Sequence, residues 1–62
     1  MSNKIYKLIF TAKTGDLEIL FEDAEKISEK DEVRVYTEIK RMKHRIADLV
    51  DDYNKTIDLI EN

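Results

Sequence analysis

The sequence predicts a small α+β protein in which an antiparallel β-hairpin is followed by one long amphipathic helix. Two apolar segments, residues 4–13 and 17–22, are rich in β-branched and aromatic types and flank the only glycine, Gly15. Such residues suit a pleated strand, and a lone glycine between two strands suits a tight turn. Apolar residues then recur at spacings of mostly three or four from Val35 to Ile60, with no proline or glycine between them. On a helix they occupy an arc of about 100°, so we expect one domain of order ββα.

The hairpin is expected over residues 4–22. A turn over residues 13–16 would pair Ala12 with Leu17. In this register the large side chains of one face meet across the strands, as the pairs Phe10–Ile19 and Leu8–Phe21. Cross-strand contacts of this kind stabilise a sheet, and a slip of one residue would disrupt both faces.

A helical interpretation of the same segment stays open. Apolar residues within 5–12 and within 17–27 also fit helical faces, with Asp16 as an N-cap for the second helix. Short apolar runs do not separate strand from helix by periodicity alone. The alternative fold class is therefore an all-α helical hairpin.

A polar connector over residues 23–30 leads into a long helix over residues 29–61. Ser28 stands where its hydroxyl can bond the amide of the third helical residue, and acidic residues fill the first turn. The β-branched Val33 and Val35 weaken the start of this helix, so a short strand over residues 33–36 is an alternative there.

The length of the helix implies a partner. A helix of this size is roughly 46 Å long, whereas strands of six to nine residues span only about 20–30 Å. The hairpin can therefore cover only part of the apolar stripe, and a small domain would forfeit much of its stability by leaving the rest in water. A second copy of the helix is the simplest cover. The expected dimer-interface residues are Ile39, Met42, Ile46, Leu49, Val50, Tyr53, Ile57 and Ile60.

Blocks of charge indicate how two copies would pair. Residues 33–45 carry a net charge of +4 and residues 46–62 carry −4. Parallel helices would set like blocks together, whereas antiparallel helices set each basic block against an acidic one. We expect an antiparallel homodimer that resembles a short coiled coil, or a four-helix assembly of such pairs. A similar stripe on a different protein would serve equally well as the cover.

The residue types argue against catalysis and against bound cofactors. The chain has no cysteine and one histidine, so disulfides, thiolate metal sites and histidine clusters are excluded. Asp51 and Asp52 diverge by about 100° on a helix and cannot act as a carboxylate pair. His44 has no serine, threonine or second ligand arranged with it. We therefore expect a non-enzymatic protein without metal or cofactor.

Two surfaces are candidates for binding. Ile5, Ile9 and Leu20 would form an apolar patch on the second face of the hairpin, where a protein partner can dock. A protein-interaction module that regulates, inhibits or assembles a larger protein is thus the main functional hypothesis.

The alternative hypotheses involve nucleic acid. Basic residues of the helix, of which three share one line, would contact phosphates, and these are Arg34, Arg41, Lys43 and Arg45. The acidic run over residues 16–32 would instead mimic a phosphate backbone and inhibit a nucleic-acid enzyme. No apolar run is long enough to cross a bilayer, and we expect a soluble cytoplasmic protein without membrane contact.

Overall fold

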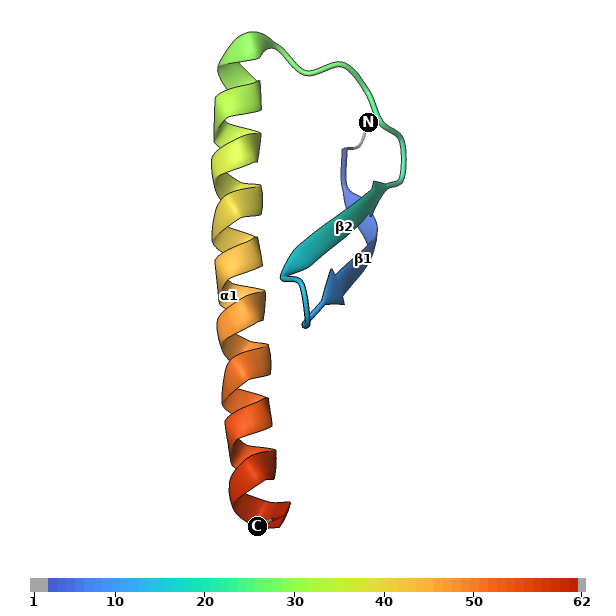
Figure 1. The fold of residues 1–62 in the computed structure, drawn as a ribbon. Coiled ribbons are helices and arrows are strands. Elements are labelled where there is room, and N and C mark those ends of the chain that lie inside the picture. Colours follow the sequence, from blue (N-terminus) through green and yellow to red (C-terminus); the bar gives the residue numbers. More distant parts are fainter. Residues whose placement is uncertain (1–2, 62) are drawn as a thin grey trace.

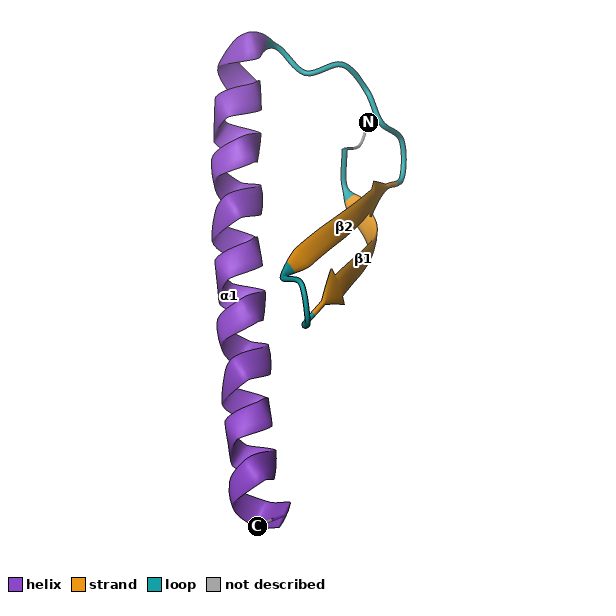
Figure 2. Cartoon of the chain, in the orientation of Figure 1, coloured by secondary structure: helices purple, strands orange, loops and turns teal. Residues whose placement is uncertain are grey.

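The computed structural model describes residues 3–61 and contains two strands and one helix. Strand β1 is Ile5–Thr11, strand β2 is Asp16–Phe21 and helix α1 is Glu29–Glu61. The helix is one continuous rod, with the hairpin beside its N-terminal half (Figures 1 and 2). The predicted ββα order and the predicted bounds of the helix are confirmed. The all-α alternative is wrong, and so is the short strand over residues 33–36, because that segment is helical.

The register of the hairpin differs from the predicted one by two residues. Leu8 pairs with Ile19 and Phe10 with Leu17, whereas the prediction set Phe10 opposite Ile19. Because side chains alternate with a period of two, a shift of two residues leaves each side chain on its predicted face. The same apolar set therefore still lines one side of the sheet.

The position of the turn explains the shifted register. Thr11 pairs with Asp16, so the turn occupies residues 12–15 and not 13–16. Gly15 is its last residue, has a φ of +77°, and donates its amide to the Thr11 carbonyl at 2.8 Å. Glycine adopts this left-handed conformation without steric cost. The turn is therefore placed so that the positive φ falls directly before strand β2.

A β-bulge at the start of β1 changes which way the first residue faces. Ile5 pairs with Phe21 and Lys7 with Leu20, so Tyr6 is an extra residue in β1. An extra residue interrupts the alternation of side chains along its strand. The bulge brings Ile5 to the position opposite Phe21, on the apolar face that looks toward the helix.

The connector is fastened at both ends. The Ser28 hydroxyl accepts the Asp31 amide at 3.3 Å, and the Ser28 carbonyl accepts the Glu32 amide at 2.9 Å, which confirms the predicted cap. At the other end, the Asn3 side chain accepts the Glu25 amide at 2.8 Å and donates to the Glu25 carbonyl at 3.2 Å. These bonds hold the loop between the hairpin and the helix in place.

The folded chain has little interior. No side chain within residues 3–61 is fully buried. Its radius of gyration is 15.1 Å, whereas a compact domain of this length is expected to have about 11 Å. It exposes 5663 Å², and a compact monomer of its mass would expose roughly 4,200 Å². The excess of roughly 1,400 Å² is the area that one side of a large interface covers.

Candidate protein-interaction surface

The apolar stripe of α1 is divided by the hairpin into a shielded part and an open part. Beside the hairpin, the stripe residues are half-buried, and these are Val35, Ile39, Met42, Ile46 and Val50. Toward the C-terminus, Leu49 is 68% exposed, Tyr53 64% and Ile60 72%, while Ile57 is half-buried. The helix continues past the hairpin turn at this end (Figure 1). The predicted interface residues therefore share one face of the helix, and three of them lie open to solvent.

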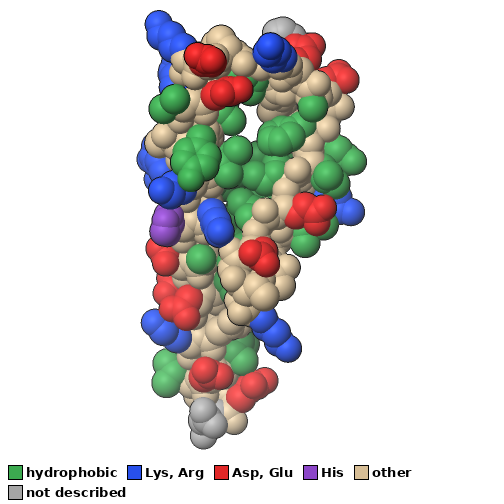
Figure 3. Space-filling model, turned by 45° about the horizontal axis from the view of Figure 1, so that its top comes forward, with side chains coloured by type: hydrophobic (Ala, Val, Ile, Leu, Met, Phe, Trp, Pro, Cys, Tyr) green, Lys and Arg blue, Asp and Glu red, His purple; other side chains and the backbone are tan. Residues whose placement is uncertain are grey.

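A groove of about 460 Å³ separates the hairpin from the N-terminal half of α1. Ile5 and Phe21 line it from the hairpin. The helix contributes apolar residues, which are Val35, Ile39, Met42 and Ile46. Hydrophobic side chains gather between the two elements in Figure 3. The groove is about three times larger than a cavity of roughly 150 Å³ that holds a benzene molecule, so it has room for several side chains.

Charged residues of α1 form one rim of this groove. Arg34, Arg41 and Arg45 line it together with Glu38. Arg41 donates to the Glu38 carboxylate at 3.0 Å, and both side chains are largely exposed. Such a surface ion pair contributes little to stability, and the rim keeps a net positive charge.

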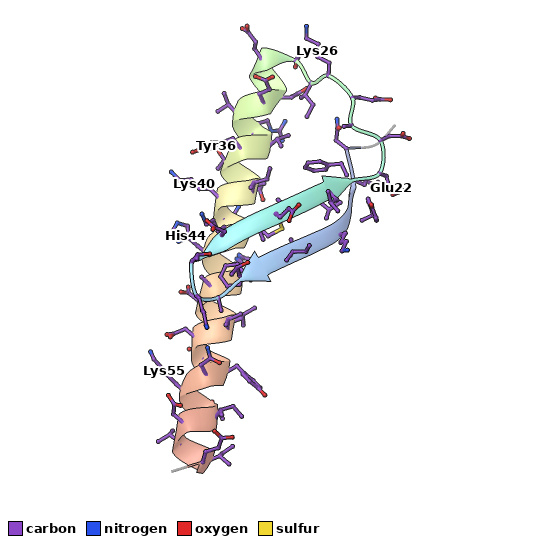
Figure 4. All side chains as sticks on the ribbon, turned by 45° about the vertical axis from the view of Figure 1, so that its right-hand side comes forward. Glu22, Lys26, Tyr36, Lys40, His44 and Lys55 are labelled. Carbon is purple, nitrogen blue, oxygen red and sulfur yellow. The ribbon has the colours of Figure 1, made fainter. Side chains whose placement is uncertain are left out.

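The four basic residues predicted as a nucleic-acid surface are only partly brought together. Arg34, Arg41 and Arg45 share the rim, whereas Lys43 is exposed and does not line the groove. Tyr36, Lys40 and His44 point to the side of the helix away from the hairpin (Figure 4). The Lys40 ammonium lies 5.7 Å from the centre of the Tyr36 ring.

The predicted hairpin patch does not form one surface. Ile5 lines the groove because of the bulge, whereas Ile9 pairs with Glu18 and Leu20 with Lys7. Ile9 and Leu20 are therefore diagonal neighbours across the strands and do not pair directly. Ile9 is 41% exposed and Leu20 is half-buried.

Several contributors to the site were missed from the sequence. Asn3 lines the groove and ties the connector to the start of the chain through its two bonds to Glu25. Phe21 was recognised as apolar but not as a wall of the groove. Tyr6, which is 64% exposed, was not singled out. The positions of Tyr6 and Ile5 depend on the bulge in β1. No residue type in this strand indicates a bulge, so the sequence does not predict these positions.

One ion pair within α1 shifts the pKa of a lysine. The Lys55 ammonium lies 3.0 Å from the Asp51 carboxylate, and this hydrogen bond and the attraction between the charges raise the pKa of Lys55 above its usual value. Within residues 3–61, no three histidine, cysteine or acidic side chains are grouped to hold a metal ion. In the same range no helix is long and apolar enough to cross a membrane.

Comparisons with known proteins give no relative from which a role can be transferred. No protein-family model, no curated protein and no solved structure matches the chain. The geometry of the groove, the open stripe and the charged rim is therefore the basis for assigning a function.

Proposed function

We propose that this chain is a small non-enzymatic protein-interaction module that dimerises through α1 and acts as a regulator, inhibitor or assembly adaptor of a larger protein. The observation that carries the proposal is the uncovered apolar face of α1 in a chain whose described residues include no fully buried side chain. Covering a large aliphatic side chain is worth about 1.5–3 kcal/mol. A partner surface supplies that energy where the hairpin does not reach.

Charge supports a second copy as the first partner. The basic block over residues 33–45 and the acidic block over residues 46–61 are equal and opposite, at +4 and −4. Antiparallel helices place these blocks side by side, and such complementarity selects partner and orientation. The area supports the same conclusion, because an excess of roughly 1,400 Å² per copy is large for so small a chain.

A larger protein partner would use the surfaces that dimerisation leaves open. The outer face of the hairpin presents Ile9, which is exposed, and Leu20, which is half-buried, and the exposed Tyr6 at the bulge adds aromatic contact area. Both strands of a two-stranded sheet also have a free edge that can accept another strand.

The solution mass tests the dimer. Light scattering over a concentration series is expected to give twice the 7.4 kDa of one chain. Ile46→Asp is expected to lower the mass to that of a monomer, because it places a charge in the stripe. If Ile46→Asp leaves both the mass and the thermal stability unchanged, the helix-mediated dimer is refuted.

Nucleic-acid binding is the second candidate, and the alignment of Arg34, Arg41 and Arg45 on one rim favours it. Under this hypothesis, Arg41→Glu combined with Arg45→Glu abolishes binding to DNA or RNA, and the wild-type affinity falls steeply with salt. Under the protein-binding hypothesis, Ile9→Asp weakens capture of the partner while the fold, followed by circular dichroism, is retained.

A further inference from the structure

The groove between the hairpin and α1 is apolar, open and rimmed by arginines. We propose that each groove is filled by the C-terminal half of α1 from a second copy, residues 49–60, in an antiparallel two-fold pair. This inference rests on the proposed dimerisation and names the segment that closes the groove.

The two surfaces match in length and chemistry. The helical wall of the groove runs from Val35 to Ile46, and the open stripe runs from Leu49 to Ile60. Each spans about 17 Å of helix. The groove has room for several side chains. The open stripe supplies large apolar side chains, including that of Tyr53, which are mostly exposed to solvent in the single chain.

The rim and the incoming segment also match in charge. The rim carries three arginines against one glutamate. Residues 46–61 carry five acidic residues against Lys55. An acidic helix that enters a basic-rimmed groove gains attraction on approach, whereas the basic half of the partner's helix would be repelled.

The register follows from laying the open stripe of one copy along the helical wall of the partner's groove. When the stripes of two antiparallel helices interdigitate, Val35 lies opposite the partner's Ile60, Met42 opposite the partner's Tyr53, and Ile46 opposite the partner's Leu49. In antiparallel pairs the same flank of each helix faces its counterpart.

Arg45 and Asp52 share one flank, since they are one heptad apart. This register therefore sets Arg45 opposite the partner's Asp52. By symmetry this contact occurs twice in the dimer.

The area that two copies can cover agrees with such a pair. An excess of roughly 1,400 Å² on each copy gives a total near 2,800 Å². Obligate homodimers bury about 2,000–5,000 Å² in total. Mutual insertion of the two C-terminal halves into the two grooves uses this surface on both copies at once.

A charge exchange tests the register. Arg45→Asp alone places two acidic residues opposite each other at both contacts, and Asp52→Arg alone places two arginines there. We expect each single variant to raise the dimer dissociation constant roughly ten- to hundredfold. The double variant restores opposite charges, and so does an equimolar mixture of the two single variants. Both are expected to return to within about threefold of the wild type.

Lys40→Asp is the matched control, since it makes the same change of charge on the side of the helix that faces away from the hairpin. It is expected to leave the dissociation constant unchanged. Sedimentation equilibrium supplies all of these values, and circular dichroism checks that each variant is helical.

The outcomes separate this inference from the proposed dimerisation. If the wild type is a dimer, and the single variants weaken it but neither the double variant nor the mixture restores it, then the register is refuted while the dimer is retained. A wild-type dimer that is insensitive to all of these changes places the C-terminal half outside the groove. A monomeric wild type refutes both proposals, and the groove then takes a different protein.

Discussion

Truncation of Leu49 distinguishes a chain that is stable alone from one whose helix is covered by a partner. Leu49 belongs to the apolar stripe and is 68% exposed in the single chain. Alanine is a good helix former, so Leu49→Ala removes apolar contacts without weakening the helix itself.

The magnitude follows from the exposure. Full burial of a leucine side chain is worth about 1.5–3 kcal/mol, so a side chain that is one-third covered contributes about 0.5–1 kcal/mol. If a partner covers the stripe, Leu49→Ala instead leaves a cavity in an interface and costs about 2–5 kcal/mol per copy. We expect the larger loss.

Val33→Ala is the matched control, because Val33 lies on the same helix about 160° from Leu49 of the stripe and is 67% exposed. Its loss is expected to be below about 0.5 kcal/mol. Urea unfolding followed by circular dichroism gives both values, at two protein concentrations tenfold apart. Equal losses below about 1 kcal/mol, with midpoints that do not depend on concentration, would refute the reasoning.

Three further predictions concern local features. Gly15→Ala is expected to lower the free energy of unfolding by about 1 kcal/mol, because the turn needs a positive φ. Gly15→Asn is expected to lower it less, since asparagine tolerates that conformation. A greater loss of thermal stability for Gly15→Asn than for Gly15→Ala would contradict this explanation. Ser28→Ala removes the helix cap and is expected to cost about 1 kcal/mol, whereas Ser28→Asp retains it; an equal loss from both in urea unfolding would argue against the cap. Asp51→Asn is expected to lower the pKa of Lys55 toward its usual value in an NMR titration. Because the pKa of Lys55 is higher in the folded chain than in the unfolded chain, the ion pair stabilises the fold fully below the unfolded pKa, and this stabilisation is lost as the pH rises through the folded pKa. If Asp51→Asn leaves the alkaline titration curve of Lys55 unchanged, the role of Asp51 is refuted.

The helix was predictable from sequence because its signals are local and repeated. Nine apolar residues at helical spacing determine the face, and Ser28 marks the start through a bond to a residue three positions away. Neither signal depends on how distant segments meet.

The hairpin was predictable as a pair of strands but not in its register. Two registers that differ by two residues place the same side chains on the same faces of the hairpin, so the pattern of apolar residues fits both. Only the position of Gly15 in the turn selects between them. The bulge at Tyr6 has no marker in the sequence, and it moves Ile5 from the outer face into the groove. The apolar face of the helix could therefore be predicted, whereas the hairpin wall of the groove could not, because the contacts of Asn3 and Phe21 depend on tertiary arrangement.

No side chain within residues 3–61 is fully buried, so we expect the folded chain to depend on a partner for part of its stability. The cellular amount of the chain would then depend on the amount of that partner. A partner that binds only the folded form adds about 2.7 kcal/mol of stability when its concentration is a hundredfold above the dissociation constant, and nothing when it is far below. Molecules without a partner would then unfold often and be open to proteolysis, since cleavage follows the population of open states. Degradation would remove the unpaired copies and spare the assembled ones. Under the proposed assembly, the sparse interior would match the amount of this protein to the amount of its partner.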